Sequence, residues 1–542
     1  MAATARLRFH LTSRIGPDGA LREPCHSRVL ESALLLTLLE RARKETVARS
    51  RLTAYLNSHR DSSQPLDRLL ARAALGRRTE RADLLDVDDF LSRAPDFTGP
   101  RKRALLDAVL YLLGAGLAPQ APAPRAFSQR FLHPWARVQV TAVKVILAHA
   151  HGLIDTFRDE DVSLLRSTQR TGTVWEGNLL IHLSVLHALA LAPGHDQLVT
   201  EGIRTALEHQ RADGGMPFIC NEDTWATAIA GVALHATGAG RPVMERIAGR
   251  LIALQQPNGG WSHSEHAQLT DVDCTSVAVE ALHLTDPAAH RPRIRRAVGA
   301  LHAVRGQDGG FPTYLSGAPS EACMTAAAAN ALSTQGTAQH DMLAQTLAYL
   351  TSQQREDGTF PPDWSSSRHH TVFRATLAAT AGADAPDDPV QGMTRRCRKL
   401  VLDTQNADGG WGQQDGAASD ALSTAYALIT LTTAGAGPEA LAAATGATAY
   451  LLTQQRPDGS IAGVPDSIGP RPFGFAIPVL TDAFTLLALG HLTHRVAPEA
   501  PTTARRPTRS ALPDPTACRA HPGRPAASRQ THETSHRRSH TP

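Results

Sequence analysis

Asp271, Asp273 and Thr275 belong to an acidic box, Asp-Val-Asp-Cys-Thr, that directly precedes the apolar segment 276–284. Two carboxyl groups held this close cannot both ionise cheaply, so the pair retains a proton. A carboxylic acid that stays protonated in a water-poor pocket can protonate an unactivated alkene. The box therefore predicts an acid that starts a carbocation reaction. The alternative is a helix start, where carboxylates are stabilised by free N–H groups and the helix dipole.

The elements that must position this box are repeated helix pairs. Six segments share one order: a helix-like stretch ending in Gln, a glycine turn, a large apolar residue and an Ala- and Leu-rich stretch. The turn glycines are Gly214, Gly259, Gly309, Gly358, Gly409 and Gly459, separated by 45, 50, 49, 51 and 50 residues. A near-constant period with room for two helices predicts an all-α repeat fold, and six pairs favour a closed α/α toroid.

Two regions lack this repeat. Residues 25–191 have helical apolar patterns without the strict turn, which predicts a second helical domain. From about residue 497 the chain is rich in Pro, Thr, Arg, Ser and His with almost no apolar periodicity, so we predict a disordered tail.

Charge and cysteine content exclude several classes. The net charge is +4, but the stretch from His491 carries nine Arg against three acids, so the preceding body is close to −2 and a nucleic-acid partner is not expected. Six dispersed cysteines without a C-x-x-C pair predict neither a disulfide framework nor a zinc cluster. With no signal peptide and no apolar run of about 18 residues, we predict a cytoplasmic protein that does not span a membrane.

Three of the turns carry the family resemblance. The spacings from Gln255 to Trp261, Gln405 to Trp411 and Gln354 to Phe360 resemble the QW repeats of squalene-hopene cyclases and class II diterpene cyclases. The resemblance implies a β-type toroid interrupted by a γ-type helical domain. The implied ranges are 1–27 for the first β helix, 28–194 for the γ-like domain, 195–495 for the β-like barrel and 496–542 for the tail.

The resemblance also assigns roles within the acidic box. These cyclases carry D-x-D-D-T at this place, and their middle Asp is the proton donor, which corresponds to Asp273. Asp271 is expected to help hold the proton. Cys274 departs from the diterpene cyclase pattern and matches the D-C-T of oxidosqualene cyclases, so Cys274 is counted among the catalytic candidates.

Aromatic side chains are the expected pocket lining, because their faces stabilise carbocations by about 0.5–2 kcal/mol each. Trp225 and Trp364 fall between a turn and an inner helix, whereas Trp261 and Trp411 are expected to be packing residues. The stretch around Trp364 resembles the W-x-x-S-P-Y-Y-x-T region of bacterial class II diterpene cyclases, which implies roles for His370 and Phe373.

Three further positions complete the predicted site. The segment 419–428 is similar to the T-A-E-E-T-A-Y segment of these enzymes, which points to Tyr426 facing inward. Ala327 stands where many of them carry a His that contacts the acid, so the proton-holding network must differ. Cys323, on the same segment, is a candidate member of that network.

A literal D-x-D-D motif also occurs at residues 86–89. It lies outside the repeats and lacks the following Thr, so we interpret it as a solvated helix start. Contact with a diphosphate or Mg²⁺ from the γ side is the alternative.

The resemblance implies a class II cyclase that converts geranylgeranyl diphosphate to a bicyclic labdane- or halimane-type diphosphate. No class I motif such as D-D-x-x-D is present, so the diphosphate is expected to remain on the product. Mg²⁺ at the diphosphate is the one cofactor anticipated, with no organic cofactor and no protein metal ligands. The protein is expected to be a monomer or a homodimer.

Four alternatives remain open at this point. In the first two the protein is a cyclase whose substrate is farnesyl diphosphate, giving a drimane-type product, or an epoxidised or triterpene isoprenoid. In the third the protein is a prenyltransferase β subunit with zinc held by Asp271, Cys274 and His370, and in the fourth it is a non-catalytic α/α repeat scaffold.

Overall fold

The computed structural model of the protein describes residues 2–43, 45–77, 88–92, 99–115, 124–129, 132–153, 156–380, 388–433 and 437–496. Within these ranges regular structure is helical, apart from two pairs of two-residue strands, so the all-α prediction is confirmed. Asp86 and Val87 of the second acidic motif, and the predicted tail beyond Val496, lie outside the described residues.

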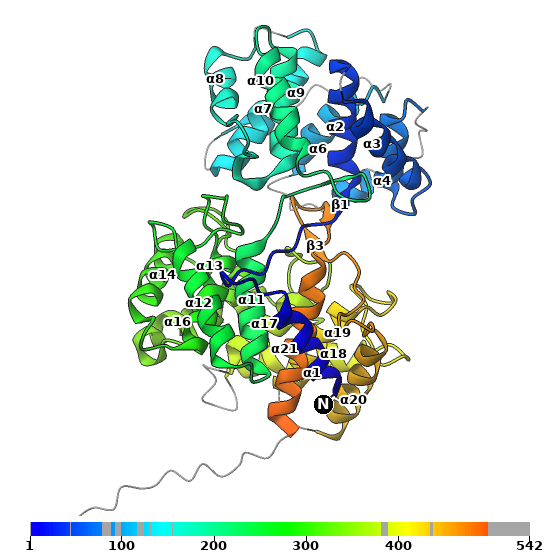
Figure 1. The fold of residues 1–542 in the computed structure, drawn as a ribbon. Coiled ribbons are helices and arrows are strands. Elements are labelled where there is room, and N and C mark those ends of the chain that lie inside the picture. Colours follow the sequence, from blue (N-terminus) through cyan, green and yellow to red (C-terminus); the bar gives the residue numbers. More distant parts are fainter. Residues whose placement is uncertain are drawn as a thin grey trace, which may run out of the picture. The chain divides into compact units, whose positions relative to one another are not determined.

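A closed ring of inner helices forms the core of the repeat region (Figure 1). Each packs against the next, and the last packs against the first. In ring order they are α11 (Asp223–Ala236), α13 (Val272–Thr285), α15 (Ala322–Ser333), α17 (His369–Ala379), α19 (Ala421–Thr433) and α21 (Pro478–Val496). Their small, apolar residues are buried on nearly all sides, as the sequence predicted.

An outer layer of helices surrounds the ring. Five come from the repeats: α12 (Arg241–Leu254), α14 (Arg291–Val304), α16 (His340–Gln353), α18 (Pro389–Asp403) and α20 (Pro438–Thr453). The sixth is the N-terminal helix α1 (Ala2–Ser13), which contacts α21 and α11. The chain therefore starts in the toroid, leaves it, and returns at α11.

The repeat turns join adjacent outer helices. Gln405 Nε2 donates to the carbonyls of Gly409 (2.8 Å) and of Ala443 on α20 (2.9 Å), so one amide ties the turn to the next helix. Gly409 has φ +86°, and a Cβ there would lie 2.7 Å from the backbone of Gly446. Only glycine fits this close approach. Trp411 is fully buried and donates to Val401 O at 2.8 Å, which confirms its packing role.

One turn of the ring differs from the prediction. Gly214 packs on Arg51 of α3 (Thr46–His59), outside the toroid. The missing turn of the ring is at Gly19, which has φ +84° and lies against the Arg246 carbonyl of α12. Its turn makes the same backbone bonds as the others, Gly16 N to Ala20 O and Gly19 N to Gly16 O. The expected position of Gly214 in the toroid was wrong. The turn at Gly19 takes that place in the ring, and it was not recognised because it lacks the Gln and the aromatic residue of the other turns.

The second helical group begins with α2 (Val29–Ala42). Its other helices are α3, α4 (Pro65–Ala74), α6 (Gly99–Leu112), α7 (Pro134–Ala150), α8 (Asp159–Ser167), α9 (Leu179–Leu191) and α10 (Asp196–Leu207). Helix α2 packs against α3, α4, α6, α9 and α10. Short 3₁₀ turns occupy Pro124–Phe127, Trp175–Gly177 and, in the repeats, Gly336–Gln339. Helix α10 packs against α9 and α2, although the predicted boundary at residue 194 assigns it to the barrel.

Two short strand pairs lie near the places where the chain passes between the toroid and the second helical group. β1 (Ser27–Arg28) pairs antiparallel with β2 (Met216–Pro217), and β3 (Ser467–Ile468) with β4 (Gly474–Phe475). Arg28 links the pairs, because its Nη1 donates to Gly469 O at 2.7 Å and its guanidinium lies 4.3 Å from the Phe218 ring centroid. The β3–β4 hairpin is thereby fixed beside the chain crossings.

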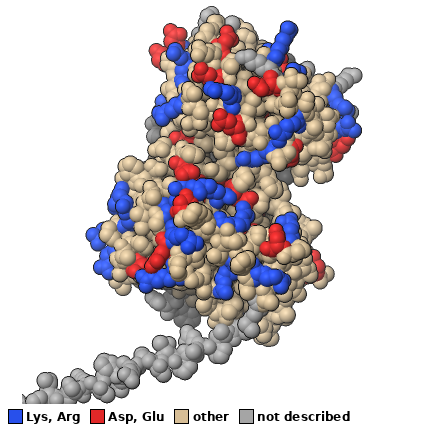
Figure 2. All heavy atoms as spheres, viewed as in Figure 1, with Lys and Arg blue, Asp and Glu red and all other residues tan. Residues whose placement is uncertain are grey.

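The surface gives no support for a polyanion partner on the face shown in Figure 2, where basic and acidic side chains are interspersed. No helix among the described residues has the length and apolar character to cross a membrane.

Candidate active site

Asp271 and Asp273 sit at the start of inner helix α13. Asp271 is the N-cap, and its carboxylate accepts a 2.7 Å bond from Cys274 N, while its own N–H donates to Trp261 O at 3.0 Å. The repeat turn thus fixes the position of the box. The predicted helix-cap role of Asp271 is confirmed, because one carboxylate oxygen caps the helix. The same group lines a cavity, and its acid role stays a prediction.

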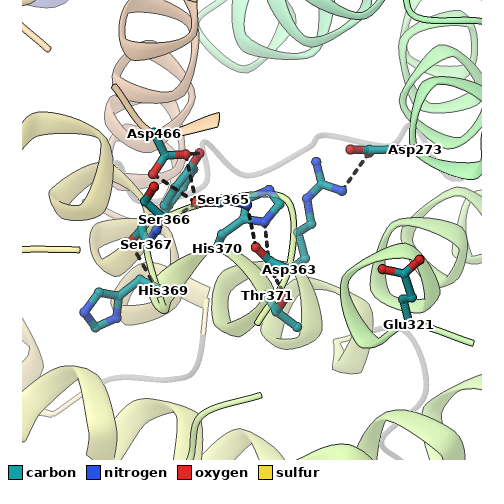
Figure 3. Close-up of polar contacts among 12 residues, drawn as sticks. Asp273, Glu321, Asp363, Ser365, Ser366, Ser367, His369, His370, Thr371 and Asp466 are labelled. Atoms are coloured by element: carbon teal, nitrogen blue, oxygen red, sulfur yellow. Dashed lines mark hydrogen bonds and ion pairs between the residues drawn. The ribbon is translucent and has the colours of Figure 1, made fainter. Parts of the chain in front are cut away.

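Asp273 has a partner that the sequence did not predict. Arg374 Nη1, on inner helix α17, donates to Asp273 Oδ1 at 2.6 Å, and this bond is drawn in Figure 3. The Arg374 side chain is 6% exposed. A guanidinium beside a carboxylate stabilises its ionised form. Arg374 therefore contacts the acid, a contact that the sequence analysis expected a His to make in related cyclases.

Two other carboxyl groups of the site, Asp271 and Glu222, have raised pKa values. Burial raises the pKa of Asp271 to about 7, and burial with repulsion from Asp271 and Asp273 raises that of Glu222 to about 8. The Cys274 thiol bonds to Asp271, and burial holds its pKa well above the usual value. Cys274 is thus a neutral donor to the acid.

These groups line one cavity with aromatic walls. Its polar side comprises Asp271, Asp273, Cys274 and Glu222. The aromatic lining comprises Trp135, Phe218, Trp225, Tyr314, Trp364 and Phe475. Aromatic faces around an acid suit a substrate that becomes cationic without meeting a nucleophile. Trp225 and Trp364 are therefore at the cavity, where the sequence expected them.

A second cavity adjoins the first and is cationic. The two share Gln139, Thr313, Tyr314, Trp364 and Pro470 as lining residues. Arg101, Lys102 and Arg471 line the second cavity. Burial, with repulsion from Arg471 and Arg101, lowers the pKa of Lys102 to about 7. Arg471 is held by Glu321 at 2.7 Å and lies 4.5 Å from the Trp364 ring centroid. This crowding of buried positive charge suits an anionic ligand.

The other predicted site residues lie behind the cavity wall. Phe373 stacks on Tyr426 with centroids 4.9 Å apart, and both contact Phe484, which lies 6.3 Å from Trp225. His370 Nδ1 is 2.9 Å from Asp363 Oδ2 (Figure 3). His370, Phe373, Tyr426 and Phe484 do not line the two cavities just described.

Cys323 is also buried and does not line these cavities, whereas the neighbouring Met324 lines the first. The exposed Asp88 of the second acidic motif forms an ion pair with Arg103, in keeping with a solvated helix start.

The predicted alternative of a zinc site is not supported. His370 bonds to Asp363 and Thr371 is bonded to the same carboxylate, whereas Asp271 bonds to Cys274. Within the described ranges, no group of three or more His, Cys, Asp or Glu side chains could hold a metal ion. Asp271, Cys274 and His370 are therefore not a ligand set.

Comparison with known proteins decides the family. Residues 317–494 match the squalene-hopene cyclase C-terminal domain, and residues 179–361 match the prenyltransferase alpha-alpha toroid domain. Drimenyl diphosphate synthase of Streptantibioticus cattleyicolor is 39% identical over 505 residues, which cover 90% of this chain and 93% of that protein. The chain belongs to the class II terpene cyclases. The resemblance stated from the repeats is confirmed, and the prenyltransferase and scaffold alternatives are set aside.

Other class II terpene cyclases agree with this membership. Drimenyl diphosphate synthase of Streptomyces showdoensis is 38% identical over 511 residues, covering 91% of this chain and 95% of that protein. The solved structure of ent-copalyl diphosphate synthase from Streptomyces platensis has a TM-score of 0.63 at 18% identity, over 91% of this chain and 99% of that one. That likeness shows the shared fold.

Proposed function

We propose that this class II terpene cyclase protonates the terminal alkene of farnesyl diphosphate and closes a bicyclic, drimane-type diphosphate. The supporting observation is the pairing of an acid-bearing aromatic cavity with a cationic one. The fifteen-carbon substrate is proposed because the two relatives that match over about nine-tenths of this chain bear the name drimenyl diphosphate synthase. The geranylgeranyl substrate expected from the sequence becomes the comparison arm of the test.

In the proposed reaction, protonated Asp273 gives its proton to the terminal alkene carbon. The carboxylate left behind is stabilised by Arg374 at 2.6 Å, and a preplaced cation beside a developing anion lowers the barrier. The alkenes of the chain then attack the cation in turn, and the last carbocation loses a proton to give the product alkene. Trp225 and Trp364 shield the cations.

The diphosphate is proposed to bind in the cationic cavity and to remain intact. Lys102, Arg101 and Arg471 offer charge-assisted hydrogen bonds to its oxygens. The described residues do not fit a Mg²⁺ held by the protein, since Glu321 is the one carboxylate lining that cavity and it is bound to Arg471. A Mg²⁺ ion would therefore have to arrive with the diphosphate, and no step is routed through it.

Incubation with farnesyl, geranylgeranyl and epoxidised isoprenoid substrates, followed by dephosphorylation and mass spectrometry, tests this function. We expect bicyclic product from farnesyl diphosphate, and at least a 10³-fold loss in Asp273→Asn. Asp420→Asn is the matched control, since Asp420 accepts from Ser423 N at the start of α19 and does not line either cavity. Turnover confined to another substrate, or unchanged in Asp273→Asn, contradicts the proposal.

A further inference from the structure

Glu222 stands in the ring at the place equivalent to Asp271. It is the N-cap of α11, as Asp271 is the N-cap of α13, and these two helices pack side by side. Asp271 uses its side chain to cap its helix, but Glu222 makes no side-chain cap bond. A structural capping role therefore does not explain why a carboxyl group occupies this place on the cavity wall.

The Glu222 carboxyl faces the acid cavity. It lines the same wall as Asp271, Asp273 and Cys274. The ionisable groups that act on it or feel its charge are these three and Cys25, from the N-terminal crossing segment. Both thiols stay neutral, because burial holds their pKa well above the usual value. His263, also on the wall, is neutral too, since burial lowers its pKa to about 4.

The charges around the three carboxyls are therefore unequal. Arg374 pairs with Asp273, while Glu222 has no ion pair or side-chain hydrogen bond with any described residue. An anion at Glu222 would be both desolvated and repelled by its neighbours. Glu222 is therefore the carboxyl of this wall that holds its proton to the higher pH, with a pKa of about 8 against about 7 for Asp271.

We propose that Glu222 is the proton reservoir of the acid site, and that it re-protonates the Asp271–Asp273 pair after each turnover. This inference rests on the proposed function. In the transfer, the O–H bond of Glu222 breaks and an O–H bond forms on the carboxylate that has given its proton to the alkene. The final deprotonation of the carbocation releases one proton to solvent and Glu222 takes one proton up from solvent, so the cycle closes with no further reactant.

Glu222→Gln tests the reservoir, because the amide keeps the size of the side chain and cannot supply a carboxyl proton. We expect the first turnover of enzyme equilibrated at acidic pH to keep its rate, while later turnovers slow by about tenfold or more. The basic limb of the kcat profile should move to lower pH, because the carboxyl with a pKa of about 8 is removed and Asp271, with a pKa of about 7, remains. Glu222→Asp retains a carboxyl and should restore repeated turnover.

A second measurement reads the proton without catalysis. Difference infrared spectra of the wild type against pH should show carboxylic acid bands that are lost on raising the pH through about 8, and Glu222→Gln should lose part of this signal, while the part from Glu280, whose pKa burial also raises to about 8, remains. A variant with the wild-type pH limb, no burst and an unchanged infrared titration overturns the reservoir. A wild type without turnover on any prenyl diphosphate removes the proposed function, yet an infrared band that is present in the wild type and lost in Glu222→Gln still assigns that proton to Glu222.

Discussion

The guanidinium of Arg374 reaches Asp273 across the inner ring, with Nη1 and Oδ1 2.6 Å apart. Their helices, α17 and α13, are not neighbours, since α15 lies between them in ring order. The side chains of α15 at this level are small, with a run of alanines from Ala326 to Ala329. We infer that Ala327, which the sequence analysis placed where many related cyclases carry a His, is the small residue that lets the arginine reach the acid.

Loss of Arg374 should disable the acid more than it disturbs binding. In Arg374→Met we expect kcat to fall by about 10²-fold, the usual effect of removing one preplaced group that stabilises developing charge, with KM changed little. Arg374→Lys should retain part of the activity, because the charge is kept and the forked geometry is lost. Steady-state kinetics on the accepted substrate would measure both.

Whether a positive charge at position 327 on α15 can replace that of Arg374 on α17 can be tested directly. Combining Arg374→Met with Ala327→His should restore activity above that of Arg374→Met, because the imidazolium replaces the lost charge. Ala327→His alone should lower activity through crowding with Arg374. A double variant no better than the single Arg374 variant would falsify the view that these positions share one role.

Lys102 should control the affinity for the diphosphate. Since burial and neighbouring arginines lower its pKa to about 7, a bound diphosphate restores the proton and gains a charge-assisted bond. We expect Lys102→Met to raise KM by about 10- to 100-fold with a smaller change in kcat. In the wild type, KM should rise as the pH increases above 7.

Arg103→Gln is the control for Lys102, since Arg103 follows it directly and pairs with Asp107 at 3.1 Å. Equal effects of the two changes on KM would point to a general loss of positive charge.

Much of the fold followed from the sequence because its signals are local and repeated. The glycine turns, the tryptophans that close them and the alanine-rich inner helices each depend on spacing within one repeat. The turn at Gly19 was missed because it occurs alone, with none of the glutamine or aromatic residues that mark the others.

The site was harder to predict because its contacts join distant segments. Asp271 and Asp273 were found from their own spacing, whereas Arg374 lies 101 residues from Asp273 and its role depends on the ring. A single arginine within the apolar helix α17 was the available signal. His370, Phe373 and Tyr426 were chosen by motif position, which indicates an inner helix but not which layer of side chains meets the cavity.

A glycine of a repeat turn should matter more for stability the closer its backbone lies to the neighbouring helix. A Cβ at Gly409 meets the backbone of Gly446, whereas a Cβ at Gly416, also at positive φ (+68°), meets open space. We expect Gly416→Ala to cost about 1 kcal/mol of unfolding free energy and Gly409→Ala at least about 2 kcal/mol more. Thermal and denaturant unfolding of the two variants would show whether the difference exists.

Asp271→Asn should separate the folding role of this residue from its acid role. The amide oxygen can still accept from Cys274 N, so the helix cap is kept, while turnover should fall by about 10²- to 10⁴-fold.

The pKa of Asp271 is about 7 in the folded protein against 3.8 for an unperturbed Asp, so the folded state binds the extra proton between these values. The stabilisation of the folded state by this proton is therefore fully present below pH 4 and is lost as the pH rises through 7. The amide has no proton to lose, so Asp271→Asn should gain stability relative to the wild type by roughly 2 to 4 kcal/mol between pH 4 and 8. A free-energy difference that stays constant over that range would show that Asp271 is ionised in the folded protein.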